Sequence, residues 1–193
     1  IWKGLVGSEM CIRDRICMHI VLGRFQPFHK GHAYLVEAAL ARGDTTIAIG
    51  SSQADSTMDN PWSADEREEM IRVWLDGREA NIVQIPDIND PPNWVEHATK
   101  FHGEGTLVTS DEGTKNLYEE SDFTVEWVDL TNRESYEGWR VRATLKMLST
   151  VYETDGLREV MLHSIPTAVV DWLIDNDALY RLYSMSRDLE HAG

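Results

Sequence analysis

Short apolar runs alternate with amphipathic helical patterns along most of the chain after residue 17. Five runs rich in β-branched residues predict strands, and each of the first four is followed by a segment with the apolar spacing of a helix. The predicted strands cover residues 19–23, 45–50, 81–86, 106–110 and 123–129, and the predicted helices cover residues 31–42, 63–77, 93–102 and 114–120. Strands that alternate with helices of about ten residues form parallel sheets covered on both faces.

The last part of the chain has a different pattern. From Glu137 to His191 the helical spacing continues without a further strand-like run, and Pro166 suits the first turn of one of these helices. We therefore predict an α/β fold, a doubly wound parallel sheet of the Rossmann-like kind, with a helical C-terminal part from about residue 137.

The first seventeen residues follow neither pattern. They show no helical or strand periodicity, and charged residues stand where a signal peptide would be cleaved. Met18 then opens the first strand pattern. We interpret residues 1–17 as a non-native leader, with a natural N-terminal arm as the alternative, and residues 18–193 as a single domain.

Composition narrows the classes of protein that fit. The 193 residues carry a formal net charge of −15 without any Lys/Arg-rich run, which disfavours a nucleic-acid partner. Both cysteines, Cys11 and Cys17, precede the first strand, so the body has no disulfide framework. No apolar stretch approaches the roughly 20 residues that span a bilayer. We expect a cytoplasmic protein with no membrane partner.

The densest chemistry lies in the segment Gly23–His32, which reads GRFQPFHKGH. It follows the first strand, where doubly wound sheets bind their ligands. Gly31 stands at the start of a helix, where free N–H groups and the helix dipole favour a phosphate. His29 and His32 are three residues apart and lie on one face of that helix, so their imidazoles could donate hydrogen bonds to phosphate oxygens.

The same segment offers positive charge but no covalent nucleophile. Arg24 and Lys30 supply the charge, and the run contains no serine, cysteine or carboxylate. This combination predicts direct attack of a substrate's own phosphate on a nucleotide phosphorus. A zinc site built on the two histidines would need a third ligand that no spacing indicates, so we predict no metal held by the protein itself. The Walker A and dinucleotide-binding glycine patterns are absent from this position.

The segment resembles the signature of the H-x-G-H nucleotidyltransferase superfamily, specifically of the archaeal-type nicotinamide-nucleotide adenylyltransferases. The stretch Gly50–Gln53 (GSSQ) is similar to the family's G-S-A-Q, and Asn60–Arg67 (NPWSADER) is similar to its N-P-F-T-x-x-E-R. The resemblance covers nearly the whole body. It implies transfer of AMP from ATP to nicotinamide mononucleotide, giving NAD and pyrophosphate, with Mg²⁺ as cofactor and a homo-oligomer as the assembly.

The resemblance also assigns residues to each substrate. Trp94 would stack on the nicotinamide ring, since a cationic pyridinium prefers an indole face. The residues expected to be catalytic are Arg24, His29, His32 and Arg142. Those expected to bind ATP are Gly23, Arg24, Phe25, Gln26, His29, Gly31, His32, Ser110, Asp111, Arg140 and Arg142, and those expected to bind nicotinamide mononucleotide are Gly50, Ser51, Asn60, Arg67, Asp87 and Trp94.

Several of these residues have structural alternatives. Trp94 could be the core anchor of its helix, and Asp87 a turn residue. Ser110 and Asp111 could form an Asx-type turn after the fourth strand, and Arg67 could pair with acidic neighbours on its own helix.

One motif departs from the family pattern. The family's late motif, usually S-G-T-x-I-R, corresponds here to residues 137–142, which read EGWRVR. Gly138 and Arg142 are retained, whereas Glu137 and Trp139 replace the two hydroxyl residues. This difference keeps two alternatives open: adenylyl or cytidylyl transfer to another small phosphate such as flavin mononucleotide, and a nucleotide-binding regulator without turnover.

Overall fold

The computed structural model describes residues 18–191 and contains one five-stranded parallel sheet. The order across the sheet is β3-β2-β1-β4-β5. The strands are β1 (His19–Gly23), β2 (Thr45–Ile49), β3 (Asn81–Gln84), β4 (Thr106–Thr109) and β5 (Thr124–Trp127). The predicted doubly wound sheet is confirmed. The predicted leader, residues 1–17, lies outside the described residues.

Four helices connect the strands. They are α1 (Lys30–Leu40), α2 (Ala64–Leu75), α3 (Trp94–His102), preceded by the 3₁₀ turn η1 (Pro91–Asn93), and α4 (Glu112–Glu119). Observed strand and helix ends differ from the predicted ones by at most two residues, which is the usual uncertainty of a helix or strand boundary. The start of α2 shows why nearby residues are enough to predict a helix boundary. Ser63 and Glu66 form a reciprocal capping box there.

Each face of the sheet buries its own apolar cluster. Val21, Ile47 and Val108 point to the face covered by α1 and α2, whereas Ile20, Ala48 and Leu107 point to the face covered by α3 and α4. This alternation follows from the two-residue side-chain period of a strand. Because both faces are covered, the central strands β1, β2 and β4 are buried along most of their length, which produced the apolar runs seen in the sequence.

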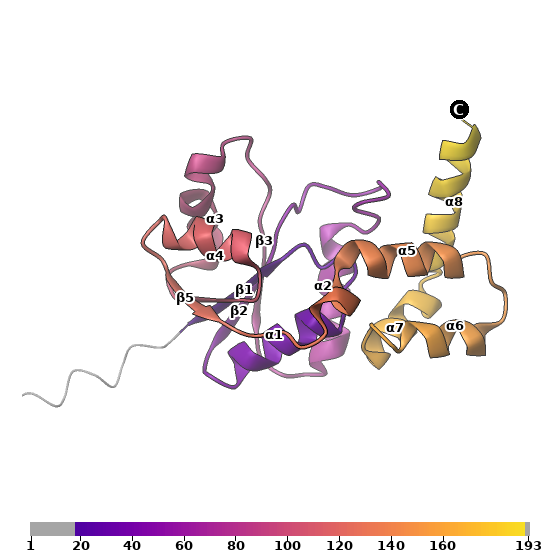
Figure 1. The fold of residues 1–193 in the computed structure, drawn as a ribbon, viewed down its shortest axis with the longest axis horizontal. Coiled ribbons are helices and arrows are strands. Elements are labelled where there is room, and N and C mark those ends of the chain that lie inside the picture. The colour runs from indigo at the N-terminus through magenta and orange to yellow at the C-terminus, as the bar shows by residue number, and fades with distance from the viewer. Residues whose placement is uncertain (1–17, 192–193) are drawn as a thin grey trace, which may run out of the picture.

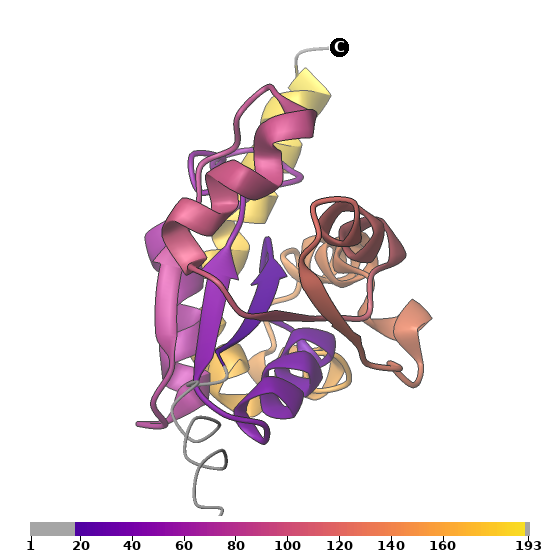
Figure 2. The same ribbon diagram turned by 90° about the vertical axis from the view of Figure 1, so that its left-hand side faces the viewer.

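The chain after β5 is helical, as predicted. A 3₁₀ turn, η2 (Arg133–Tyr136), leads into α5 (Gly138–Leu148), α6 (Thr154–Met161), α7 (Thr167–Asp175) and α8 (Ala178–His191). These four helices gather at one end of the molecule (Figure 1) and lie behind the sheet when it is viewed from the opposite end (Figure 2). Their apolar residues continue the cluster on the α1 and α2 face.

Two expectations, one about Pro166 and one about Lys30, are wrong. Pro166 is the N-cap of α7 and precedes its first turn, because its ψ of 147° is extended. Lys30 does not add charge to the phosphate side of the segment Gly23–His32. Its Nζ donates to the carbonyl of Leu162 at 2.6 Å and so ties α1 to the C-terminal helices.

Candidate active site

A cavity of about 450 Å³ lies outside the carboxyl ends of the strands, centred on the point where the strand order reverses between β1 and β4. Each of the five strands, or the loop that follows it, contributes to its wall. Of the residues predicted from the sequence, those that line it are Gly23, Arg24, His29, Gly31, His32, Gly50, Ser51, Asp87, Trp94, Ser110 and Asp111. The cavity has the size of a small-ligand site.

His29 and His32 cap helix α1 reciprocally. The backbone N–H of His29 donates to Nδ1 of His32 at 3.3 Å, and the backbone N–H of His32 donates to Nδ1 of His29 at 3.4 Å. The two rings stack with centroids 3.6 Å apart. Because both Nδ1 atoms accept, a neutral imidazole at either position carries its proton on Nε2. The pair therefore offers two Nε2–H donors.

Burial keeps both rings neutral. It lowers the pKa of His29 to about 3, and the positive charge of Arg142 contributes in the same direction. Burial also lowers the pKa of His32 well below its usual value, with a further contribution from His29. At neutral pH the two imidazoles therefore present polar N–H groups without formal charge.

Gly31 lies in a tightly packed position at the start of α1. A Cβ at this position would lie 2.9 Å from the Cβ of Tyr136 and 3.1 Å from the ring of His29. In the first turn of α1, the N–H of Lys30 donates to the Ser164 carbonyl and that of His32 to His29. The N–H of Gly31 has no acceptor among the described residues, and Gly31 lines the cavity. One helix N-terminal donor is thus open to a ligand, as the sequence predicted.

Arg67 is fully buried and does not line the cavity. Its guanidinium donates to five backbone carbonyls, those of Ser63, Arg24, Gly50, Ser51 and Ala54, at 2.9 to 3.5 Å. Burial lowers its pKa to about 10. Arg67 therefore holds together the loops that follow β1 and β2. This arrangement differs from both expectations for Arg67, which were contact with a substrate and ion pairing with acidic residues of its own helix.

Three further predicted residues lie behind the cavity wall. Phe25 is buried, and the side-chain amide of Gln26 forms a two-point pair with the backbone of Trp62, at 2.7 and 3.1 Å. Asn60 stands in the same loop as Trp62, and its Oδ1 is buried without a partner among residues 18–191. Their part in ligand binding stays a prediction.

Asp87 and Trp94 line the other end of the cavity, each braced from behind. Gln53 accepts from the backbone N–H of Asp87 at 2.8 Å, and its amide donates to the Asp87 carboxylate at 3.5 Å. Trp94 packs edge-on against buried Tyr118, with ring centroids 6.3 Å apart. Trp94 is therefore both part of the core and part of the cavity wall.

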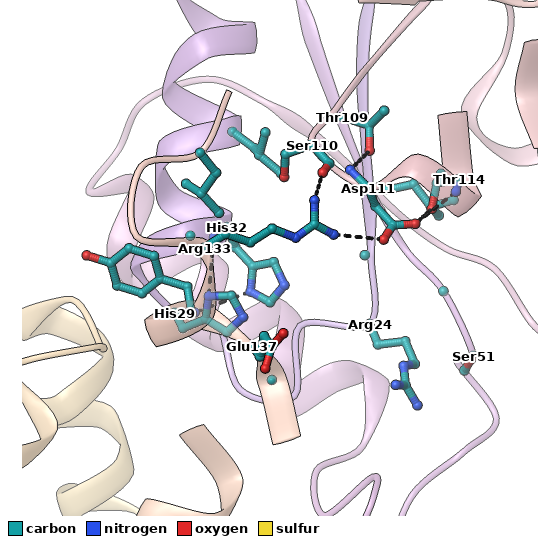
Figure 3. Close-up of a pocket in the computed structure, with 18 of the residues that line it drawn as sticks. Arg24, His29, His32, Ser51, Thr109, Ser110, Asp111, Thr114, Arg133 and Glu137 are labelled. Atoms are coloured by element: carbon teal, nitrogen blue, oxygen red, sulfur yellow. Dashed lines mark hydrogen bonds and ion pairs between the residues drawn. The ribbon is translucent and has the colours of Figure 1, made fainter. Parts of the chain in front are cut away.

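Arg133 enters the cavity from η2, and the sequence analysis assigned it no role. Its guanidinium donates to the Ser110 carbonyl and, at 3.0 Å, to the Asp111 carboxylate (Figure 3). Asp111 is also the N-cap of α4, because its carboxylate accepts from the N–H of Thr114, three residues on, at 2.8 Å. An Asx turn would bond two residues on, so the side chain caps a helix instead. Hydrogen bonds from Thr114 and the charge of Arg133 lower the pKa of Asp111 despite the opposing effect of its burial. The available signal for Arg133 was its place four residues before the altered motif at residues 137–142.

Comparison with known proteins places the chain in a family. A family profile described as cytidylyltransferase-like matches residues 20–144. Nicotinamide-nucleotide adenylyltransferases of Thermoplasma acidophilum and Ignicoccus hospitalis are 30% and 31% identical over 171 and 172 residues, which cover 86% of this chain and 90% and 95% of the relatives. The chain belongs to the nicotinamide-nucleotide adenylyltransferase family.

Solved structures agree with this family fold. A bifunctional NMN adenylyltransferase/ADP ribose pyrophosphatase of Francisella tularensis, complexed with AMP and a manganese ion, matches with a TM-score of 0.58 at 20% identity. The match covers 84% of this chain and 53% of that longer one. A nicotinic acid mononucleotide adenylyltransferase of Plasmodium falciparum, complexed with NaAD, matches with a TM-score of 0.53 at 11% identity over 84% of this chain and 96% of that one.

The altered motif of this family member lies at the start of α5. Glu137 and Gly138 line the cavity, whereas Arg140 and Trp139 do not. Arg140 pairs with Glu137 at 3.0 Å and lies 4.7 Å from the centroid of the exposed Trp139 ring. Arg142 points back toward the histidines, and its Nη1 donates to the Gln26 carbonyl at 3.0 Å. Burial lowers the pKa of Arg142, and the positive charge of Arg24 adds to that effect.

No group of three or more His, Cys, Asp or Glu residues within residues 18–191 is arranged to hold a metal ion. The carboxylates that line the cavity are Asp87, Asp111 and Glu137. Magnesium in nucleotide sites is commonly held by substrate phosphates and one or two carboxylates, so this arrangement fits an ion that enters with a nucleotide. None of the described helices is long and apolar enough to cross a membrane.

Proposed function

We propose that this chain transfers AMP from ATP to nicotinamide mononucleotide, forming NAD and pyrophosphate. The observation that carries the proposal is the His29 and His32 pair, which fixes two uncharged Nε2–H donors at the switch point of the sheet. Relatives that cover most of the chain support the acceptor, since they are nicotinamide-nucleotide adenylyltransferases.

The ATP phosphates would occupy the His29 side of the cavity. His29, His32 and the free N–H of Gly31 supply hydrogen-bond donors there, and Arg24 supplies positive charge. Arg142 does not line the cavity but adds positive charge beside His29. Adenosine would extend toward Ser110 and Asp111 at the end of β4. These residues converge from three segments, so the charge of a triphosphate would be met by groups already held in place.

Nicotinamide mononucleotide would occupy the opposite side. Trp94 offers an aromatic face to the pyridinium ring, and Asp87 offers a carboxylate held in place by Gln53. Gly50 and Ser51 line the wall between this side and the histidines, in a loop whose carbonyls Arg67 holds.

The reaction then needs no covalent intermediate. An oxygen of the nicotinamide mononucleotide phosphate attacks the α-phosphorus of ATP, the bond from that phosphorus to the bridging oxygen breaks, and the electron pair leaves with pyrophosphate. The serine hydroxyls of the cavity lack a base in the histidine pair, because both Nδ1 atoms already accept backbone N–H groups. Catalysis would come from positioning and charge stabilisation.

We propose that Mg²⁺ accompanies ATP as its phosphate complex. The substrate phosphates and water would supply most of its ligands, as is common for magnesium in nucleotide sites. When bound, the ion would neutralise charge on the phosphates.

An acceptor panel tests the proposal. The protein is incubated with ATP, Mg²⁺ and one of nicotinamide mononucleotide, flavin mononucleotide or no acceptor, and pyrophosphate release is followed. We expect release only with nicotinamide mononucleotide. Pyrophosphate release with flavin mononucleotide alone would identify flavin mononucleotide as the acceptor. ATP binding without any pyrophosphate release would favour a nucleotide-binding regulator without turnover.

The homo-oligomer and the cytoplasmic location stay predictions. Large apolar side chains exposed on the C-terminal helices, among them Met147 and Tyr180, are what a contact between copies would bury.

A further inference from the structure

Arg181 of α8 reaches from the C-terminal helices to the start of α2. Its guanidinium forms a two-point ion pair with Glu66, with both N···O distances at 2.6 Å. The same Nη1 donates to the Pro61 carbonyl at 3.0 Å. Arg181 therefore joins α8 at once to the loop before α2 and to the first turn of α2.

Both contacts lead to elements that shape the active site. Pro61 precedes Trp62, whose backbone pairs with the side chain of Gln26 at 2.7 and 3.1 Å. Gln26 lies between Arg24 and His29, and its carbonyl accepts from Arg142 at 3.0 Å. A shift of the loop before α2 would therefore displace the segment that carries the histidines.

The second contact leads to the loop after β2. Glu66 accepts from the Ser63 N–H at 2.8 Å and so fixes the start of α2. The next residue, Arg67, holds the carbonyls of Arg24, Gly50 and Ser51. The position of α2 thus sets the relation between the proposed ATP side and the proposed acceptor side.

We propose that Arg181 is a positioning residue for adenylyl transfer, holding the segment Gly23–His32 and the loop after β2 in their reactive arrangement through Pro61 and Glu66. This inference rests on the proposed function. It goes beyond that function by making α8, none of whose described side chains lines the cavity, a determinant of the reaction rate.

The chain offers variants that separate positioning from general stability. Glu66→Gln removes the charge facing Arg181, yet glutamine at this position still supports a capping box. Arg181→Lys keeps the charge but loses the two-point geometry. Arg158→Ala is the matched control, because Arg158 pairs with Asp171 between α6 and α7 and contacts neither loop.

The experiment measures kcat and KM for both substrates, together with the folded fraction from urea unfolding. We expect kcat per folded molecule to fall about tenfold or more in Arg181→Ala, since small displacements of reacting groups cost up to about 100-fold. The kcat values of Arg181→Lys and Glu66→Gln should lie between those of the wild type and Arg181→Ala. The double variant Arg181→Ala/Glu66→Gln should have the same kcat as Arg181→Ala, because both changes break the same ion pair. Arg158→Ala should keep the wild-type kcat.

Wild-type kcat in folded Arg181→Ala would overturn the inference. If that variant does not fold, wild-type kcat in both Arg181→Lys and Glu66→Gln would do so. Affinity for a non-hydrolysable ATP analogue and amide hydrogen exchange in residues 24–28 and 50–62 are measured in parallel. If the wild type shows no turnover, the proposed function fails, and Arg181 is tested by these two readouts. Weaker analogue binding and faster exchange in Arg181→Ala than in Arg158→Ala would then support it, and equal values would overturn it.

Discussion

His29 and His32 hold each other's backbone N–H groups through their Nδ1 atoms, at 3.4 and 3.3 Å, while their rings stack. This relationship gives both histidines a structural role at the start of α1. Each ring completes the N-terminal cap of α1 with its Nδ1, so the proton of each neutral ring is on Nε2. One pair of side chains therefore caps α1 and lines the cavity proposed to bind phosphate.

The buried pair should make stability depend on pH. The pKa of His29 is about 3 in the folded chain, against about 6.5 for an unperturbed histidine. Below about pH 6.5 the unfolded chain takes up a proton that the folded chain does not, so stability is complete above this pH and falls as the pH decreases toward 3. The expected slope from His29 alone is about 1.4 kcal/mol per pH unit.

Urea unfolding of the wild type and of His29→Asn at about pH 7, 6 and 5 measures this slope. Asparagine can cap a helix but does not titrate. The free energy of unfolding should therefore depend less steeply on pH in the variant. Equal slopes would show that His29 is not held neutral by the fold.

Gly31 should not tolerate a side chain. In Gly31→Ala the new Cβ would lie 2.9 Å from the Cβ of Tyr136, a rigid contact that forces η2 or α1 to move. We expect a loss of about 1–3 kcal/mol in the free energy of unfolding. Gly50→Ala is the control, because the nearest atom to its Cβ would be 3.7 Å away, and it should change stability by less than about 0.5 kcal/mol. Equal losses in the two variants would contradict the packing role of Gly31.

Trp94 should affect one substrate selectively. Replacement by alanine removes the proposed stacking surface, and we expect KM for nicotinamide mononucleotide to rise about tenfold while KM for ATP changes less than about threefold. Trp127→Ala provides the control, since Trp127 is exposed on β5 and its indole binds Asp129. Steady-state kinetics with each substrate varied in turn gives both values. A rise in both KM values would indicate that Trp94 serves only the core.

Glu137 places a negative charge in the cavity proposed to bind a triphosphate. Glu137→Ser removes that charge, and we expect KM for ATP to fall about fivefold, which corresponds to about 1 kcal/mol of relieved repulsion. Arg140, released from its pair with Glu137, adds to the effect. If Glu137 instead holds the metal ion, KM for ATP will rise or kcat will fall in Glu137→Ser. ATP titrations at several Mg²⁺ concentrations separate these outcomes.

The features predicted correctly are those with local causes. The strand runs, the start of α2 and the turn from β1 into α1 are each encoded within about ten residues. The prediction that Lys30 adds charge to the segment Gly23–His32 was wrong because its acceptor, the Leu162 carbonyl, is distant in the chain. The role of Arg67 depends likewise on four carbonyls outside its helix and one at its N-cap. Tertiary contacts of this kind leave no periodicity or spacing in the sequence.

Transfer of label from ATP labelled at its α-phosphorus tests the central claim most directly. With Mg²⁺ and nicotinamide mononucleotide, the wild type should move the label into NAD and release one unlabelled pyrophosphate per transfer. His32→Ala, with its fold verified by urea unfolding, should be slower by at least about 100-fold. Label that stays in ATP or AMP in the presence of nicotinamide mononucleotide, or a folded His32→Ala variant with the wild-type rate, would contradict the account.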